Sequence, residues 1–115
     1  MIRIKRVYET AEPEDGARIL VDRLWPRGIE KKKLRLGSWY KDVAPSSELR
    51  KWSHHDPARW HEFRKRYFAE LDSNPPAWSS LAELARNGNV TLLYSAKDKR
   101  HNNAEALRDY LESKL

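Results

Sequence analysis

Two continuous apolar runs constrain the fold of this chain more than any other feature. They are "ARILVD" at residues 17–22 and "VTLLYS" at residues 90–95. Both lack the alternation of apolar and polar residues that marks a half-exposed strand, and such runs are typical of strands buried on both faces of a sheet. We therefore expect two inner strands of a sheet that is covered on both sides.

Two weaker segments add extended structure. In "MIRIKRVY", residues 1–8, charged residues alternate with aliphatic ones, which predicts a short strand. In "SWYKDVAP", residues 38–45, Lys41 and Asp42 interrupt the pattern and Pro45 favours an extended end. Only about ten residues separate the first strand from the second. This is short for a helical crossover and favours a hairpin between them.

Helical patterns fill most of the remaining chain. Asp56 is suited to cap a helix whose first position is Pro57. The expected helices cover residues 45–52, 56–71, 78–88 and 103–114. Their expected buried positions are Trp60, Phe63, Tyr67 and Leu71, then Trp78, Leu81 and Leu84, and finally Ala104, Leu107 and Leu111.

The alternation of buried strands with helices predicts an α/β fold. With 115 residues, the chain is long enough for one core but not for two. We expect a single small domain over residues 1–115, with a short, mostly parallel sheet flanked by helices.

Charge and composition narrow the partners and the compartment. Lys and Arg number 23 against 17 Asp and Glu, which gives a net charge of +6 and favours anionic partners, although much of this charge is expected on a solvated surface. No cysteine is present, so disulfides and thiolate chemistry are excluded and a cytoplasmic location is expected. No apolar run reaches the length of about 18 residues that spans a bilayer, so we expect no membrane partner.

Polar sequence follows three of the expected strands. The segments are "DRLWPRG" at 22–28, "KDVAPSS" at 41–47 and "SAKDKRHNN" at 95–103. In open α/β sheets, ligands bind beyond the carboxyl ends of the parallel strands, where helix N-termini also point. The three segments therefore predict one crevice that binds a phosphate-bearing or other anionic small ligand.

The predicted roles within this crevice follow from side-chain chemistry. Arginines offer a planar fork for oxyanions, tryptophan offers a stacking face, and carboxylates or histidine can move protons. The residues expected to bind the ligand are Arg23, Trp25, Arg27, Lys41, Ser46, Lys97 and Asn102, and the candidate catalytic residues are Asp22, Asp98 and His101.

Several of these residues also have a structural interpretation. Asp22 can form an ion pair with Arg23 or Arg27 that fixes the loop, and Trp25 can pack beneath it. Asn102 followed by Glu105 resembles a capping box, which makes helix initiation an alternative role for Asn102. Both interpretations stay open at the level of the sequence.

Other site chemistries lack a motif. His54, His55, Asp56 and His61 lie close together but match no recognised metal-ligand spacing, so no metal site is predicted. The chain has no nucleophile elbow, Walker loop or dinucleotide fingerprint, and no cofactor is indicated.

The chain resembles the YeaO-like family, a bacterial and archaeal domain of unknown function. The resemblance rests on "ILVDRLWPRG", "WYKDVAPSSELRKW", "HDPARWHEFRKRYFAEL" and "VTLLYSAKDKRHNNAEALRDYL", and it covers about residues 2 to 113. It implies a compact cytosolic α/β domain and brings no established reaction. Longer members of the wider family carry a cysteine and a Cys-His-Arg run. The corresponding positions here are Tyr94, Asn102, Asn103 and Ala104, so thiol chemistry implied for those relatives cannot operate in this chain.

Two functional hypotheses follow. The first is binding of an anionic small ligand in the crevice, with or without turnover. The alternative is a nucleic-acid-binding module that uses Arg64, Lys65 and Arg66 with the basic stretches 30–35 and 97–100. Docking of the basic surface on an acidic protein is a third hypothesis.

Overall fold

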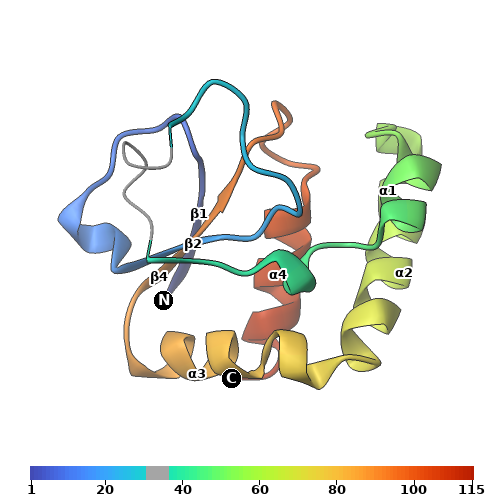
Figure 1. The fold of residues 1–115 in the computed structure, drawn as a ribbon. Coiled ribbons are helices and arrows are strands. Elements are labelled where there is room, and N and C mark those ends of the chain that lie inside the picture. The colour runs from blue at the N-terminus through green and yellow to red at the C-terminus, as the bar shows by residue number, and fades with distance from the viewer. Residues whose placement is uncertain (31–36) are drawn as a thin grey trace.

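The structure contains one sheet of four parallel strands in the order β1-β4-β2-β3 (Figure 1). It is a computed structural model that describes residues 1–30 and 37–115. The strands are β1 (Ile2–Arg6), β2 (Ala17–Leu20), β3 (Ser38–Trp39) and β4 (Val90–Tyr94). The helices are α1 (Ser47–Ser53), α2 (Trp60–Asp72), α3 (Ser79–Asn87) and α4 (Asn103–Glu112). The predicted α/β fold with a short, mostly parallel sheet is therefore confirmed.

The expected hairpin between the first two strands is wrong. β4 lies between β1 and β2, so that Leu92 is aligned with Ile4 on one side and with Ile19 on the other. The connection from β1 to β2 passes the start of β4, next to Asn89, and makes a tight turn at Gly16, where φ is 63°. A β-carbon there would lie 2.1 Å from the carbonyl oxygen of Asn89, so only glycine fits this close approach.

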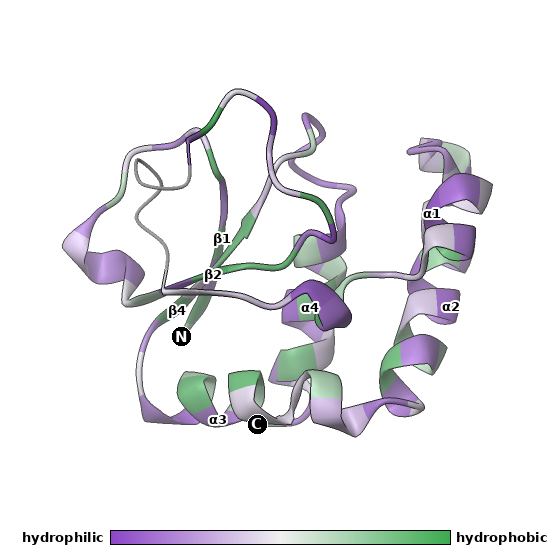
Figure 2. Cartoon of the chain, viewed as in Figure 1, coloured by the Kyte–Doolittle hydropathy of each residue, from purple (hydrophilic) through white to green (hydrophobic). Residues whose placement is uncertain are grey.

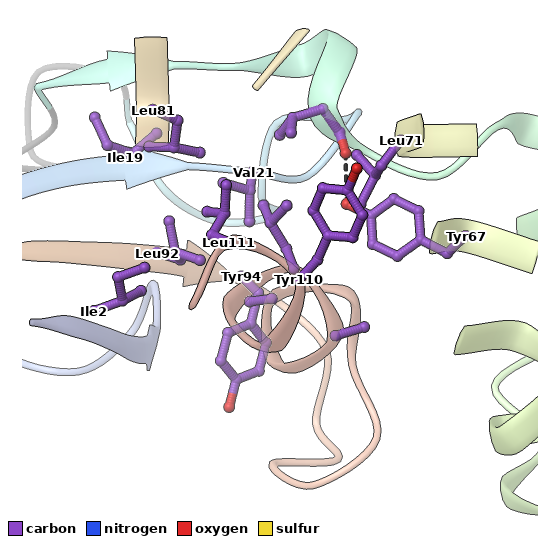
Figure 3. Close-up of a cluster of buried hydrophobic side chains, with 14 of the residues drawn as sticks. Ile2, Ile19, Val21, Tyr67, Leu71, Leu81, Leu92, Tyr94, Tyr110 and Leu111 are labelled. Atoms are coloured by element: carbon purple, nitrogen blue, oxygen red, sulfur yellow. Dashed lines mark hydrogen bonds between the residues drawn. The ribbon is translucent and has the colours of Figure 1, made fainter. Parts of the chain in front are cut away.

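One face of the sheet carries the main hydrophobic core. Side chains alternate between the two faces of a strand, and the members of this face include Ile2, Ile19 and Leu92. α3 contributes Leu81 and α4 contributes Leu111 to the same cluster (Figure 3). The helix turns that face the sheet are hydrophobic, whereas the outer surfaces of α1 and α2 are largely hydrophilic (Figure 2).

The opposite face is covered by chain rather than by helices. Val7, Leu20 and Leu93 form a second, smaller buried cluster on it, against which Trp25 and Trp39 pack. The segment after β2 therefore folds back over the sheet. Of the basic stretch 30–35, all but the first residue lies outside the described residues.

The helix predictions are largely confirmed. Phe63, Tyr67 and Leu71 are buried on α2, and Ala104, Leu107 and Leu111 are buried on α4. Asp56 caps a 3₁₀ turn (Pro57–Arg59) that precedes α2, rather than α2 itself. The third extended segment is shorter than expected, since only Ser38–Trp39 pairs in the sheet before a 3₁₀ turn (Lys41–Val43) begins. Within the described residues, no helix is both long and apolar enough to cross a bilayer.

One helix face was assigned incorrectly. Leu84 on α3 is 40% exposed, although the sequence placed it with Trp78 and Leu81 on the buried face. Ala82 and Ala85 are buried beside Leu81 instead. The small alanines thus occupy the buried face of α3, and the larger Leu84 points outward.

Candidate ligand-binding pocket

A pocket of about 350 Å³ opens where β2 and β4 end. Its walls come from the loop after β2, the loop after β4, the start of α4, and residues of α1 and α2. In Figure 1 these segments lie in the upper right half of the molecule, at the carboxyl edge of the sheet. Its size lies at the lower end of the range for small-molecule sites.

Asp22 follows β2 and joins two of the pocket walls. Its Oδ2 accepts hydrogen bonds from the backbone N–H of Ser95 at 2.9 Å and from the Ser95 hydroxyl at 2.8 Å. Burial raises the pKa of Asp22, and the hydrogen bonds from Ser95 and Asn103 oppose that rise. Among the described residues Asp22 forms no ion pair with Arg23 or Arg27, so the structural alternative of such a pair does not hold.

The two arginines of "DRLWPRG" point to different places. Arg23 donates to the carbonyl oxygens of Ala44 at 3.3 Å and Pro45 at 3.4 Å, beside a shallower hollow near Tyr67. Arg27 lines the pocket and is exposed, while its backbone carbonyl accepts a hydrogen bond from the hydroxyl of Tyr8 at 3.1 Å. The predicted pair of arginines on one ligand is therefore not assembled from Arg23 and Arg27.

A second arginine does reach the pocket, from α1. Arg50 lines it and is exposed, and the sequence analysis did not identify it. Within the described residues, the guanidinium groups of Arg27, Arg50 and Arg100 have no hydrogen-bond or ion-pair partner. The described arginines whose side chains are held by a carboxylate or a carbonyl are Arg3, Arg6, Arg18, Arg23, Arg59, Arg64, Arg66, Arg86 and Arg108.

His101 contributes an oriented imidazole. Its Nδ1 lies 2.9 Å from Oδ2 of Asp98, and its ring packs edge-on against Trp60 with 5.3 Å between ring centroids. The backbone N–H of Arg100, followed by the His101 side chain, lowers the pKa of Asp98. His101 lines the pocket, whereas Asp98 stands behind it and fixes its ring.

Aromatic side chains form the apolar part of the wall. Trp25 lines the pocket, and it also packs edge-on against Trp39 and donates its indole N–H to the carbonyl of Ile29 at 2.7 Å. Trp60 and Phe63 stack on one another with 5.5 Å between centroids. Trp60 is only half-buried, so the stripe that the sequence assigned to the core also supplies a pocket wall.

Three other predicted ligand-binding residues lie elsewhere. Lys41 lies over the ring of Trp39 at 4.1 Å, and Lys97 is exposed outside the pocket. Ser46 caps α1, and its hydroxyl donates to Glu70 at 2.6 Å. None of the three lines the pocket.

Asn102 has both of the roles considered for it. It is buried and lines the pocket, and its side-chain oxygen accepts the backbone N–H of Glu105 at 2.8 Å, which caps α4. Helix initiation is thus present in the structure, while ligand contact stays a prediction.

The backbone conformation at the end of α1 explains why His55 lies at the pocket. His54 and His55 both have positive φ, 48° and 56°, at the end of α1. Two successive left-handed residues turn the chain sharply, and His55 then lines the pocket. The sequence shows two histidines here but no glycine or asparagine that would indicate such a turn. Within the described residues no group of three or more His, Asp or Glu side chains is placed to hold a metal ion.

Comparison with known proteins gives consistent matches over the whole chain. A family model described as "Inactive DUF488-N3 subclade" matches residues 1–115. "Uncharacterized protein YeaO" of Escherichia coli strain K12 is 49% identical over 112 residues, which are 97% of each chain. "Uncharacterized protein Mb3100c" of Mycobacterium bovis and "Uncharacterized protein Rv3073c" of Mycobacterium tuberculosis strain H37Rv are each 43% identical over 113 residues, which are 98% of this chain and 95% of theirs. No solved structure matches significantly.

Proposed function

Because the chain belongs to the YeaO-like family, in the inactive DUF488-N3 subclade, we propose that it binds an anionic small molecule with a flat ring and does not transform it. A nucleoside monophosphate is a representative ligand of this class. The pocket at the carboxyl ends of β2 and β4 is the proposed site.

The observation that carries this proposal is the pair of unpartnered guanidinium groups at the pocket. Arg27 and Arg50 come from different elements and line the same cavity, and among the described residues neither guanidinium group forms a hydrogen bond or ion pair, although the charge of Arg50 opposes the rise that burial causes in the pKa of nearby Asp22. Arginine binds phosphate and carboxylate through a planar fork of N–H donors. The start of α4 also forms part of the pocket wall, and a helix N-terminus generally favours anions.

The aromatic wall supports the second half of the proposal. Trp25, Trp60 and Phe63 line the cavity from two different elements. Stacking of a base on such rings is worth about 1–3 kcal/mol. A ligand that combines a ring with an anionic group would use both kinds of contact.

Binding without turnover agrees with the absence of the cysteine and the Cys-His-Arg run that the longer relatives carry. Tyr94, Asn102, Asn103 and Ala104 stand at those positions, and none of them carries a thiol. Tyr94 is buried in β4 and its pKa is raised by burial, so its hydroxyl is not activated as a nucleophile.

The proposal is tested by titrating the protein separately with AMP, adenosine and orthophosphate. The change in tryptophan fluorescence at each concentration gives the binding affinity. We expect AMP to bind more tightly than either of its parts, because only AMP engages both the rings and the arginines. Arg27→Gln and Arg50→Gln should each weaken AMP binding about tenfold, since a hydrogen bond to a charged group is worth about 1.5–3 kcal/mol.

Arg86→Gln is the matched control. Arg86 is exposed on α3, is bound by Glu83 and lies outside the pocket, so its removal should leave AMP affinity unchanged. Chromatography of the AMP after prolonged incubation should recover it intact. Absence of saturable AMP binding to the wild-type protein contradicts the proposal, and so does an equal effect of all three substitutions.

A further inference from the structure

The proposed pocket is lined by side chains of opposite charge. Asp22 is half-buried at the end of β2, and its carboxylate is tied to the loop after β4. Arg27 and Arg50 are exposed. A ligand in this pocket therefore meets both a carboxylate and guanidinium groups, and the charge of Arg50 is near enough to oppose the rise that burial causes in the pKa of Asp22.

The Asp22 carboxylate has acceptor capacity left for a ligand. An ionised carboxylate offers about four lone-pair positions and no donor. Ser95 fills two of them, both on Oδ2, and the amide of Asn103, which donates to the carbonyl of Val21, lies near enough to oppose the rise that burial causes in the pKa of Asp22. Since Asp22 lines the pocket, at least one remaining acceptor position is available there.

We propose that Asp22 selects and orients the ligand by accepting a hydrogen bond from an amino or hydroxyl group, while the anionic group of the ligand is held by Arg27 and Arg50. This inference rests on the proposed function and specifies it further. The ligand must carry N–H or O–H donors as well as a phosphate or carboxylate.

The reverse orientation is unfavourable for an electrostatic reason. A phosphate beside Asp22 would place two negative groups together in a partly buried site, where their repulsion is much stronger than in water. The fixed position of Asp22, held by two hydrogen bonds from one residue, prevents it from turning away.

In a nucleotide the donor can belong to the base or to the sugar, and one titration series distinguishes them. AMP carries both an exocyclic amino group and a ribose 2′-hydroxyl. Purine riboside 5′-monophosphate lacks the amino group, and 2′-deoxy-AMP lacks the hydroxyl. We would titrate wild-type protein and Asp22→Asn with all three nucleotides. Asparagine keeps the size of the side chain but replaces one acceptor by a donor.

We expect the loss of the ligand's donor group and the loss of the Asp22 carboxylate to weaken binding by the same amount. One of the two analogues should bind the wild-type protein at least tenfold more weakly than AMP. Asp22→Asn should weaken AMP to the affinity of that analogue and leave the analogue itself little changed. The analogue that loses affinity identifies the source of the donor. Ser95→Ala, which removes only the hydroxyl bond to Oδ2, should reduce the discrimination partly, and this variant keeps the test valid if Asp22→Asn does not fold.

Three results would overturn the inference. They are equal binding of all three nucleotides by the wild-type protein, undiminished AMP affinity in Asp22→Asn, and unchanged discrimination in Ser95→Ala if Asp22→Asn does not fold. In each case AMP still binds and depends on Arg27 and Arg50, so the proposed function survives. If AMP does not bind the wild-type protein at all, the proposed function fails and this inference fails with it.

Discussion

Asp15 shows how much one residue can depend on its neighbours in space. It lies in the polar stretch 10–16, yet it is completely buried at the end of the sheet. Its carboxylate is bound by Lys5 at 2.8 Å and by Arg18, and its backbone carbonyl accepts the hydroxyl of Thr91 at 2.8 Å. These partners come from β1, β2 and β4, so a single residue connects three strands, two of them through its carboxylate.

Replacing this carboxylate should destabilise the fold in a pH-dependent way. Burial alone would raise the pKa of Asp15, but the hydrogen bonds from Lys5, the Glu12 backbone and Arg18 outweigh it and the pKa is lowered. At pH 7 we expect Asp15→Asn to lower the free energy of unfolding by about 1–3 kcal/mol, because the buried Arg18 and the half-buried Lys5 both lose a charged hydrogen-bond partner, although Lys5 keeps Glu12. Urea unfolding measures this difference.

The sign of the pH effect follows from the lowered pKa. A carboxylate with a lowered folded-state pKa stabilises the protein above its unfolded-state value of 3.8, and this contribution disappears as the pH falls below 3.8 through the folded-state value. The difference between wild type and Asp15→Asn should thus be constant above that range and shrink below it. Asp42→Asn, at an exposed position, is the control and should show no difference at pH 7. A constant difference at all pH values would contradict the role assigned to the charge.

The residues that the sequence could and could not identify differ in how they reach the pocket. Asp22, Trp25 and Arg27 follow a recognisable strand directly, so the rule for strand ends finds them. Arg50 reaches the pocket from a helix whose position depends on tertiary packing. The burial of Asp15 cannot be predicted from the sequence for the same reason, because its charge partners lie on strands that only the fold brings close.

Elements were predicted well where one periodicity dominates. α2 and α4 carry clear apolar stripes, and the structure buries them. β4 is recognisable because its residues other than Thr91 are apolar, and the structure shows that it is an inner strand with neighbours on both sides. The order of the strands in the sheet cannot be predicted from the sequence. A connection of about ten residues is long enough for a hairpin between β1 and β2, and also for the path past β4 that Gly16 permits.

α3 provides a direct test of a corrected helix face. Leu84 is exposed and Ala85 is buried, although they are neighbours in sequence. Leu84→Glu should change the free energy of unfolding by no more than about 0.5 kcal/mol, as is usual for surface positions. Ala85→Glu should cost at least about 1–3 kcal/mol from overpacking alone, with a further cost for the buried charge. Both values come from chemical denaturation, and equal costs would contradict the assignment of the face.

At the scale of the whole molecule, parallel pairing explains why the pocket exists. All strands of a parallel sheet present their carboxyl ends at one edge, so the loops after β2 and β4 must converge there. Ser95 and Asp22 then hydrogen-bond across this edge, 73 residues apart in sequence. The aromatic rings of α2 reach the same edge because the long connection from β3 to β4 returns over the main core.

The net charge of the molecule gives the last prediction, which concerns nucleic acid. A positive charge of +6 favours duplex binding only if the cations form a continuous, unneutralised face. In the helix face that the alternative hypothesis uses, Arg64 pairs with Asp109 at 3.2 Å and Arg66 pairs with Glu62 at 3.0 Å. These pairs neutralise most of the charge locally. We therefore expect duplex DNA to compete poorly with AMP at about 150 mM salt, where non-specific complexes are weak.

The triple variant Arg64→Gln, Lys65→Gln, Arg66→Gln separates the two functions. If the pocket is the binding site, the variant binds AMP as the wild type does, since none of the three residues lines the pocket. If the helix face binds nucleic acid, wild-type affinity for a duplex falls steeply with salt because counterions are released, and the variant loses both the affinity and the steep slope. Fluorescence anisotropy of a labelled duplex at several salt concentrations measures both quantities. A steep salt dependence that the triple variant abolishes would favour nucleic acid as the partner, because the geometry of the pocket cannot produce that result.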